Sequence, residues 1–296
     1  MTLRHDAETL LTRLVLRGLR ALGPVRASNL CGAVARWVGP LLPVSGVADA
    51  NLRAALPELD AKARRRVVRG VWENLGRTVG ELPHLADLRP TPSGPGWELV
   101  GQDILDTLTA QGGPAILISG HISNWEMLPV ASATGGVTFY SMYRPIENKA
   151  LDAMLLDLRR QAMHGDVEMF PKGAAGARQA MRHLAAGGRL GMLMDQKMND
   201  GIEARFFGRP AMTAPALAVL ALRLRCPVVP GYVERLGPAR FRVTCDPPLP
   251  LPDSGNRSAD VAALTQAVND KLEEYIRMQP HAWLWLHRRW PRGDAG

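Results

Sequence analysis

The chain has 296 residues, of which 46% are hydrophobic, enough for one large α/β domain or two small ones with a sizeable core. A net charge of +8 favours an anionic partner: nucleic acid, acidic lipid headgroups or an acidic carrier protein. Three widely spaced cysteines without a C-x-x-C pair argue against a disulfide framework or a zinc site, and no apolar run approaches the roughly 18–20 residues that span a bilayer.

The N-terminal residues 1–45 are predicted to form a helical region that associates with a membrane, ahead of a main domain at 46–296. Arg13, Arg17 and Arg20 fall on one face of a helix whose remaining surface is Leu and Val. The pattern fits a helix in the membrane interface with its arginines toward acidic headgroups. It fits equally a surface helix packed on the domain.

Residues 58–88 are predicted to form one or two helices with a basic, solvated face, and residues 89–96 a loop. Short apolar strands and helices then alternate. Strands are expected at 114–119, 137–142, 189–195, 227–233 and 240–245, and helices at 124–133, 148–162, 174–187, 213–225 and 258–278. The alternation predicts a single α/β domain with a central, mostly parallel or mixed sheet flanked by helices. No nucleotide-binding fingerprint is present.

A His and a Glu follow the first of these strands, where an open α/β sheet places its chemistry. His121 is a natural proton acceptor near neutral pH, and the carboxylate of Glu126 can fix its tautomer. Residues five apart do not meet on one helix, so the pairing requires His121 to precede the helix. Ser123 to Glu126 reads as a capping box that starts the helix at Ser123. Alternatively, Glu126 only caps the helix and His121 is an ordinary loop residue.

Further candidates lie at later strand ends. Arg144 is placed to grip a phosphate bidentately, or else to pair with Glu147 or Asp152. Asp195 and Gln196 line the acceptor site, buttress the His–Glu pair, or are structural.

Three more candidates lie before or at the start of the predicted helix 213–225. Phe207 and Gly208 form part of an acyl-chain slot, or the aromatic ring belongs to the core. Thr213, a candidate substrate contact, also reads as an N-cap ahead of Pro215. The C-terminal tryptophans and arginines suit either a membrane interface or a segment docked on the sheet.

The blocks that carry a family resemblance occur in a fixed order: Gly120-His-Ile-Ser-Asn-Trp-Glu126, Met142-Tyr-Arg-Pro145, Met194-Asp-Gln196, Arg205-Phe-Phe-Gly208, Ala211-Met-Thr213, Cys226-Pro-Val-Val-Pro230 and Trp283 to Trp290. Over roughly residues 10–290 the ordered set resembles the lipid A biosynthesis (lauroyl/myristoyl) acyltransferases of the lysophospholipid acyltransferase superfamily. A departure is Ile122-Ser123, where the family often has an aromatic and a small residue.

The resemblance implies that His121 acts as general base and that Glu126 orients its ring. The expected reaction moves a fatty acyl group from acyl carrier protein, or from coenzyme A, to a hydroxyl of a lipid A precursor. It also implies inner-membrane lipids as a partner at the cytoplasmic face of the inner membrane, with no metal, no cofactor and no nucleic acid.

Several other functions stay open at this point. The acceptor is alternatively a lysophospholipid, another glycolipid or an aminolipid. A lipid-binding protein without catalysis is disfavoured by the retained His121 and Glu126. A serine hydrolase is disfavoured because no G-x-S-x-G is present.

Overall fold

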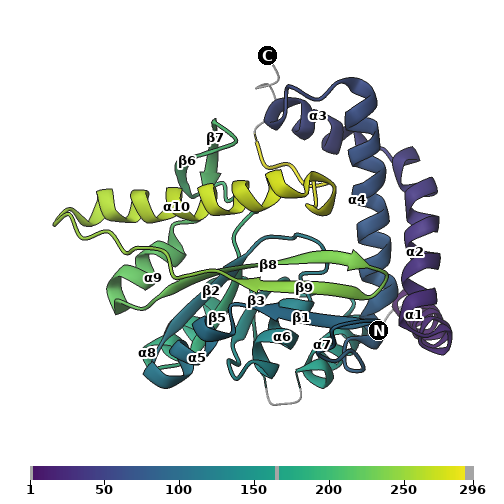
Figure 1. The fold of residues 1–296 in the computed structure, drawn as a ribbon, viewed down its shortest axis with the longest axis horizontal. Coiled ribbons are helices and arrows are strands. Elements are labelled where there is room, and N and C mark those ends of the chain that lie inside the picture. The colour runs from purple at the N-terminus through teal and green to yellow at the C-terminus, as the bar shows by residue number, and fades with distance from the viewer. Residues whose placement is uncertain (1–2, 164–166, 291–296) are drawn as a thin grey trace.

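The computed structural model describes residues 3–163 and 167–290, and these residues build one α/β domain around a central sheet (Figure 1). The sheet has the strand order β1-β9-β8-β2-β5-β3-β4. Its neighbours pair in parallel except β8 and β9. The strands are β1 (Gly96–Val100), β2 (Ala115–Ser119), β3 (Tyr140–Tyr143), β4 (Met169–Pro171), β5 (Arg189–Leu193), β8 (Val228–Gly237) and β9 (Arg240–Cys245). The predicted α/β class with a mostly parallel sheet is confirmed.

The central strand β2 is buried at every position, as expected for a parallel strand with helices on both faces. Its side chains alternate between two cores. Ile116 and Ile118 face a cluster with α9 (Ala216–Leu224) and α10 (Arg257–Met278). Leu117 faces a second cluster with α5 (Gln102–Gln111). Figure 1 shows α10 crossing one side of the sheet, with α5 and α6 (Met127–Thr134) on the other.

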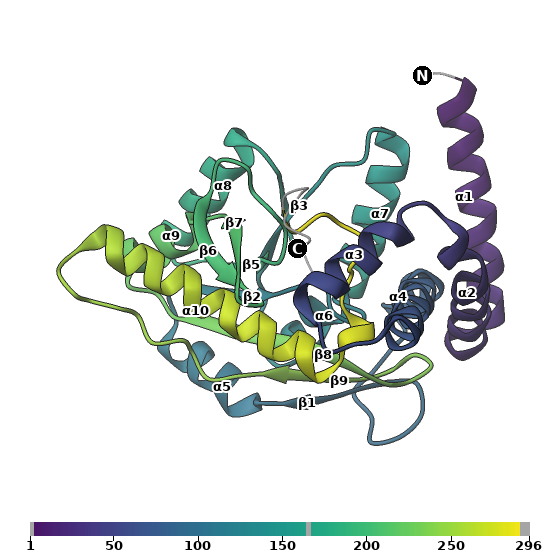
Figure 2. The same cartoon turned by 90° about the horizontal axis from the view of Figure 1, so that it is seen from above.

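A group of N-terminal helices stands beside the sheet (Figures 1 and 2). The helix α4 begins after Asp60, whose carboxylate caps it by accepting a hydrogen bond from Ala63 N at 2.6 Å. It packs closely on α2, because a Cβ added at Gly76 would lie 2.3 Å from the carbonyl oxygen of Cys31. These elements are α1 (Leu3–Leu22), α2 (Pro24–Val38), η1 (Gly39–Leu41), α3 (Ser45–Ala55), α4 (Ala61–Glu81) and η2 (Leu82–His84).

The helix α1 projects away from the sheet (Figure 2) and leaves much of its apolar surface in solvent. Leu11 and Leu14 on α1 are 64% and 55% exposed. Within residues 3–163 and 167–290, no single helix is long and apolar enough to cross a membrane. The bent pair Pro24–Leu41 and Ser45–Ala55, which meets at 84°, passes that test by length and composition. The division at residue 45 and the membrane association of residues 1–45 stay predictions.

Several elements differ from the sequence-based expectations. The helix α6 begins at Met127 and α9 at Ala216, three residues later than predicted in each case. The reason at α9 is a hairpin of β6 (Ile202–Phe206) and β7 (Arg209–Thr213), which continues to Thr213. The strands β1, β4, β6 and β7 and the helices α3 and α5 were not expected, whereas α7 (Lys149–Ala162) and α8 (Ala174–Ala185) fall within or at the predicted ranges.

Candidate active site

His121 and Asp195 meet because they follow two neighbouring parallel strands at the same level. Ser119, the last residue of β2, pairs with Leu193, the last residue of β5. His121 lies two residues after Ser119, and Asp195 lies two residues after Leu193. The register is continued by the amide of Met194, which donates a hydrogen bond to the carbonyl oxygen of Ser119 at 2.8 Å. The carboxyl ends of parallel strands therefore assemble the pair.

Asp195 holds both the ring and the backbone of His121. Its Oδ1 lies 2.9 Å from Nδ1 of the imidazole, and its Oδ2 accepts the backbone N–H of His121 at 2.8 Å. A third donor is the indole of Trp283, whose Nε1 lies 2.7 Å from Oδ2. Asp195 is completely buried, while the His121 side chain is 17% exposed. The carboxylate is thus satisfied inside the protein and the ring keeps an opening to the outside.

The electrostatics of the pair favour a charged imidazole. Burial alone lowers the pKa of His121, but the charge and hydrogen bonds of Asp195, aided by the charge of Glu126, raise it above its usual value. Burial raises the pKa of Asp195, and the interaction with His121 outweighs it and holds this pKa well below its usual range. An ionised Asp195 beside Nδ1 places a proton on that nitrogen. In the neutral ring, Nε2 is then the proton acceptor, and no described residue hydrogen bonds to it.

Glu126 makes a different contact from the one predicted. Both of its carboxylate oxygens are taken by Arg159 on α7, with Nε to Oε2 at 2.8 Å and Nη2 to Oε1 at 2.5 Å. The side chains are 8% and 17% exposed, so the pair is mostly buried. The predicted pairing of Glu126 with the imidazole is not observed among the described residues, because Nδ1 hydrogen bonds to Asp195. Glu126 still acts on His121 through its charge.

The predicted capping box is also wrong. Glu126 occupies the N-cap position of α6 and makes no side-chain capping hydrogen bond. Ser123 has a φ of 55°, and its backbone N–H donates to the carbonyl oxygen of Ala282 at 2.9 Å. Its own carbonyl accepts from Asn74 Nδ2 at 3.1 Å. These contacts to distant segments hold residue 123 in a loop, so the helix starts only at Met127.

The loops that follow β3 and β4 bring positive charge toward the His121–Asp195 pair. Lys172, just after β4, donates to Gln196 Oε1 at 3.0 Å, and its charge opposes protonation of His121. Arg144, just after β3, is exposed and forms no ion pair within the described ranges. Asp152 instead accepts hydrogen bonds from Tyr143 and from the backbone of Ile146. The alternative of an Arg144 salt bridge to Glu147 or Asp152 is therefore wrong for this structure.

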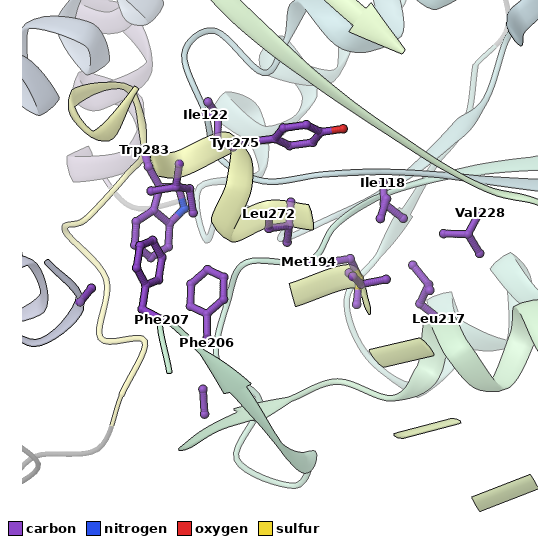
Figure 3. Close-up of a cluster of buried hydrophobic side chains, with 14 of the residues drawn as sticks. Ile118, Ile122, Met194, Phe206, Phe207, Leu217, Val228, Leu272, Tyr275 and Trp283 are labelled. Atoms are coloured by element: carbon purple, nitrogen blue, oxygen red, sulfur yellow. The ribbon is translucent and has the colours of Figure 1, made fainter. Parts of the chain in front are cut away.

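Phe207 and Gly208 form the turn of the β6–β7 hairpin, with φ values of 53° and 69°. Phe207 is 6% exposed, and its ring lies 5.9 Å from that of Trp285. Figure 3 shows Phe206 and Phe207 beside Trp283 in the buried cluster. The structure thus places Phe207 in the aromatic core, the second of the two alternatives.

Thr213 ends β7 and does not cap α9, whose N-cap position is Pro215. Its hydroxyl accepts hydrogen bonds from Arg289 Nη2 at 2.7 Å and Asn269 Nδ2 at 3.2 Å. Arg289 is completely buried, and burial lowers its pKa to about 10. Thr213 thus helps to anchor the C-terminal segment, which docks on the domain.

Two residues of the site had no distinguishing signal in the sequence. Arg159 is one of two adjacent arginines in the last turn of an amphipathic helix, where a basic residue is ordinary. Trp283 stands out in the sequence only as one of the C-terminal tryptophans. Asp195 was noticed, and its predicted alternative of buttressing the histidine is the geometry observed.

Comparison with known proteins places these residues in a wider context. A family model described as bacterial lipid A biosynthesis acyltransferase matches residues 3–292. A phosphatidylinositol mannoside acyltransferase of Mycobacterium tuberculosis is 26% identical over 193 residues, 64% of this chain and 58% of that protein. A lipid A biosynthesis acyltransferase of Haemophilus influenzae is 22% identical over 275 residues, 90% of this chain and 83% of that protein. The match therefore spans little more than half the length of the mycobacterial relative.

Proposed function

The chain belongs to the bacterial lipid A biosynthesis acyltransferase family, and from that premise we propose that it transfers a fatty acyl group from acyl carrier protein to a hydroxyl of a lipid A precursor. The observation that carries the proposal is the hydrogen-bonded His121–Asp195 pair at two strand ends. It offers a general base whose ring hydrogen bonds to no described Ser or Cys side chain, which suits direct attack by a substrate hydroxyl.

In the proposed reaction, Nε2 of His121 removes the proton from the acceptor hydroxyl. The oxygen attacks the thioester carbonyl, and a tetrahedral oxyanion forms. The C–S bond then breaks, and the thiolate leaves and takes the proton back from the imidazolium. Asp195 stabilises the imidazolium while it carries that proton, in keeping with the raised pKa of His121.

The loop after His121 offers donors for the oxyanion. The backbone N–H groups of Asn124 and Trp125 have no acceptor among the described residues. Free N–H groups that point at the developing charge stabilise a tetrahedral intermediate. We assign this role to the two amides, because the loop that carries them is held in place by Asn74 and Ala282.

Glu126 and Arg159 serve the same centre indirectly. Their bidentate contact ties the His121 loop to α7. The negative charge of Glu126 also raises the pKa of His121. Glu126 is therefore a positioning residue in this mechanism, and Asp195 takes over the orienting role.

The surroundings suit substrates that carry phosphates. Lys172 and Arg144 lie at the ends of adjacent strands, and Arg144 forms no ion pair with any residue that the structure describes. Guanidinium and ammonium groups bind phosphate well. Both expected substrates carry phosphate, on the carrier's prosthetic arm and on the sugar headgroup. The exposed leucines of α1 and the net charge of +8 suit a position on acidic lipid at the cytoplasmic face of the inner membrane.

A second candidate acceptor is a different glycolipid. The mycobacterial relative is a phosphatidylinositol mannoside acyltransferase, and the matched segment covers 64% of this chain. The same His121–Asp195 chemistry serves a sugar hydroxyl as well as an acyl-chain hydroxyl. Only the acceptor separates the two proposals.

The test is a transfer assay with labelled acyl carrier protein and a panel of acceptors, followed by mass analysis of the products. We expect the lipid A precursor to gain one acyl chain, and His121→Gln to abolish the gain while the protein stays folded by circular dichroism. Preferential labelling of the glycolipid would transfer the proposal to that acceptor. If labelling is unchanged in His121→Gln, the mechanism is refuted for both acceptors.

A further inference from the structure

A basic cavity of about 390 Å³ lies outside the proposed active site, among α4, α2, the strand β8 and the short helix η3 (Pro280–Ala282). Figure 2 shows α2 and α4 side by side. Arginines dominate the wall of the cavity: Arg36, Arg66, Arg77 and Arg235, with His281 beside them.

The charges in this cavity do not balance. Glu73 is the single carboxylate in its lining, and it pairs with both Arg36 at 2.7 Å and Arg77 at 2.9 Å. The charge of Arg235 is neutralised by an ion pair with the fully buried Glu81. Arg66 makes no ion pair within the described part of the chain. One guanidinium is therefore unpaired, and two others share one carboxylate.

A phosphate group matches this surplus. Arginine presents paired N–H donors that fit two phosphate oxygens. Arg36 and Arg66 line the cavity from two helices with N–H groups that no described residue accepts, whereas the N–H groups of Arg77 already donate to Glu73, Ser28 and Asn29. Burial lowers the pKa of His281, so its ring is a neutral hydrogen-bonding partner at neutral pH. The volume is in the range of small-ligand sites, roughly 300–1,000 Å³.

The neighbouring surface favours a phosphate that is attached to a lipid. Trp37, directly after Arg36, is 74% exposed, and Val34 one turn earlier is 54% exposed. Leu41 on η1 is 82% exposed. Basic side chains beside an exposed apolar strip are the arrangement that holds a headgroup while the acyl chains lie against the strip.

We propose that this cavity binds the phosphate of an anionic membrane-lipid headgroup, at a site separate from the His121 centre. The site also touches the loop that carries His121. Asn74 lines the cavity and donates to the carbonyl oxygens of Ser123 at 3.1 Å and Ala282 at 3.3 Å. The binding itself does not depend on the proposed acyl transfer.

Calorimetric titration with dihexanoyl phosphatidylglycerol, kept below the concentration at which it aggregates, tests the proposal on the full chain. Inorganic phosphate and dihexanoyl phosphatidylcholine are titrated in parallel. The variant is Arg66→Gln, which removes an exposed and unpaired side chain and should leave the fold intact. The matched control is Arg65→Gln, an exposed neighbour on α4 that does not line the cavity.

We expect saturable binding of phosphatidylglycerol by the wild-type protein and by Arg65→Gln, and a dissociation constant about tenfold higher in Arg66→Gln. Inorganic phosphate should bind more weakly at the same site. Equal binding of inorganic phosphate would assign the cavity to a free anion and overturn the headgroup. Equal binding of phosphatidylcholine, or an unchanged affinity in Arg66→Gln, would overturn the site.

Discussion

Two carboxylates act on His121, and their partners give them different roles. Asp195 is completely buried, and its oxygens face the imidazole, the backbone amide of His121 and the indole of Trp283. Both carboxylate oxygens of Glu126 accept hydrogen bonds from Arg159. Asp195 lies within hydrogen-bond distance of Nδ1 of His121, whereas Glu126 makes no hydrogen bond to the imidazole among the described residues. Direct control of the ring tautomer therefore rests with Asp195.

The buried Glu126–Arg159 pair predicts a stability effect at the residue scale. Arg159→Ala leaves Glu126 without its partner in a mostly buried position, so we expect the free energy of unfolding to fall by about 3 kcal/mol. Arg160→Ala, next to it and exposed, is the control and should change this quantity by less than about 0.5 kcal/mol. Urea unfolding of both variants measures the difference. Equal effects would show that the pair contributes nothing specific.

At the scale of elements, the C-terminal segment completes the site. Residue Trp283 pairs with Ile122 in an isolated antiparallel bridge, and its ring packs 5.7 Å from that of Phe206 (Figure 3). The segment thereby reaches from the hairpin β6–β7 to the loop after β2. Its docking is what delivers an indole N–H to Asp195.

Removing that indole N–H should reduce turnover without removing the fold. We expect Trp283→Phe to lower kcat about tenfold with little change in KM, because a hydrogen bond to a charged group is worth about 1.5–3 kcal/mol. Trp290→Phe is a matched control, since the buried indole nitrogen of Trp290 has no hydrogen-bond partner among residues 3–163 and 167–290. Steady-state kinetics of the two variants decide. A similar kcat in both would contradict a positioning role for Trp283.

The elements that sequence could predict are those with an unambiguous local pattern. The strand β2 is a continuous apolar run, and α7 begins directly after Asn148, which caps it through its side chain. The hairpin strands β6 and β7 are each only five residues long, and a single short alternation such as Ile202–Phe206 is a weak signal, although it has the period of a strand. The helix predicted at 213–225 was consequently started too early.

The site was only partly predictable for a similar reason. His121 and Asp195 were each marked by their place after an apolar strand. Their contact spans 74 positions and follows from the register of β2 and β5, which no local pattern specifies. The predicted pairing of His121 with Glu126 depended on a helix that starts at Ser123. In the structure Ser123 is held in a loop, and Glu126 binds the guanidinium of Arg159.

For the whole molecule, the exposed apolar residues gather at the N-terminal helices. Leu10, Leu11, Leu14 and Val15 on α1 are each at least half exposed. An isolated exposed leucine is ordinary, but a contiguous strip on a projecting helix indicates a contact surface. The basic cavity between α2 and α4 lies close to a second group of exposed apolar residues, Val34 and Trp37 on α2. Both features suit the same lipid surface.

The proposed membrane contact predicts the behaviour of one leucine pair. Leu11→Ser should weaken partition onto acidic phospholipid vesicles by about tenfold, because insertion buries an apolar side chain worth roughly 1.5–3 kcal/mol. Leu236→Ser, on β8 and 40% exposed, is the control and should partition like the wild-type protein. Vesicle flotation measures both. Equal flotation of the two variants would place the membrane contact elsewhere.

The most direct test of the mechanism is the pH dependence of kcat/KM in Asp195→Asn, with Asp157→Asn on the exposed face of α7 as the control. The charge of Asp195 raises the pKa of His121, so its removal should lower that pKa and move the acidic limb of the profile to lower pH. The maximum should fall by about 10²- to 10⁴-fold, because the imidazolium loses its stabilising partner. A profile that superimposes on that of the wild-type protein, in both limb and height, would contradict the assignment of His121 as a base held by Asp195.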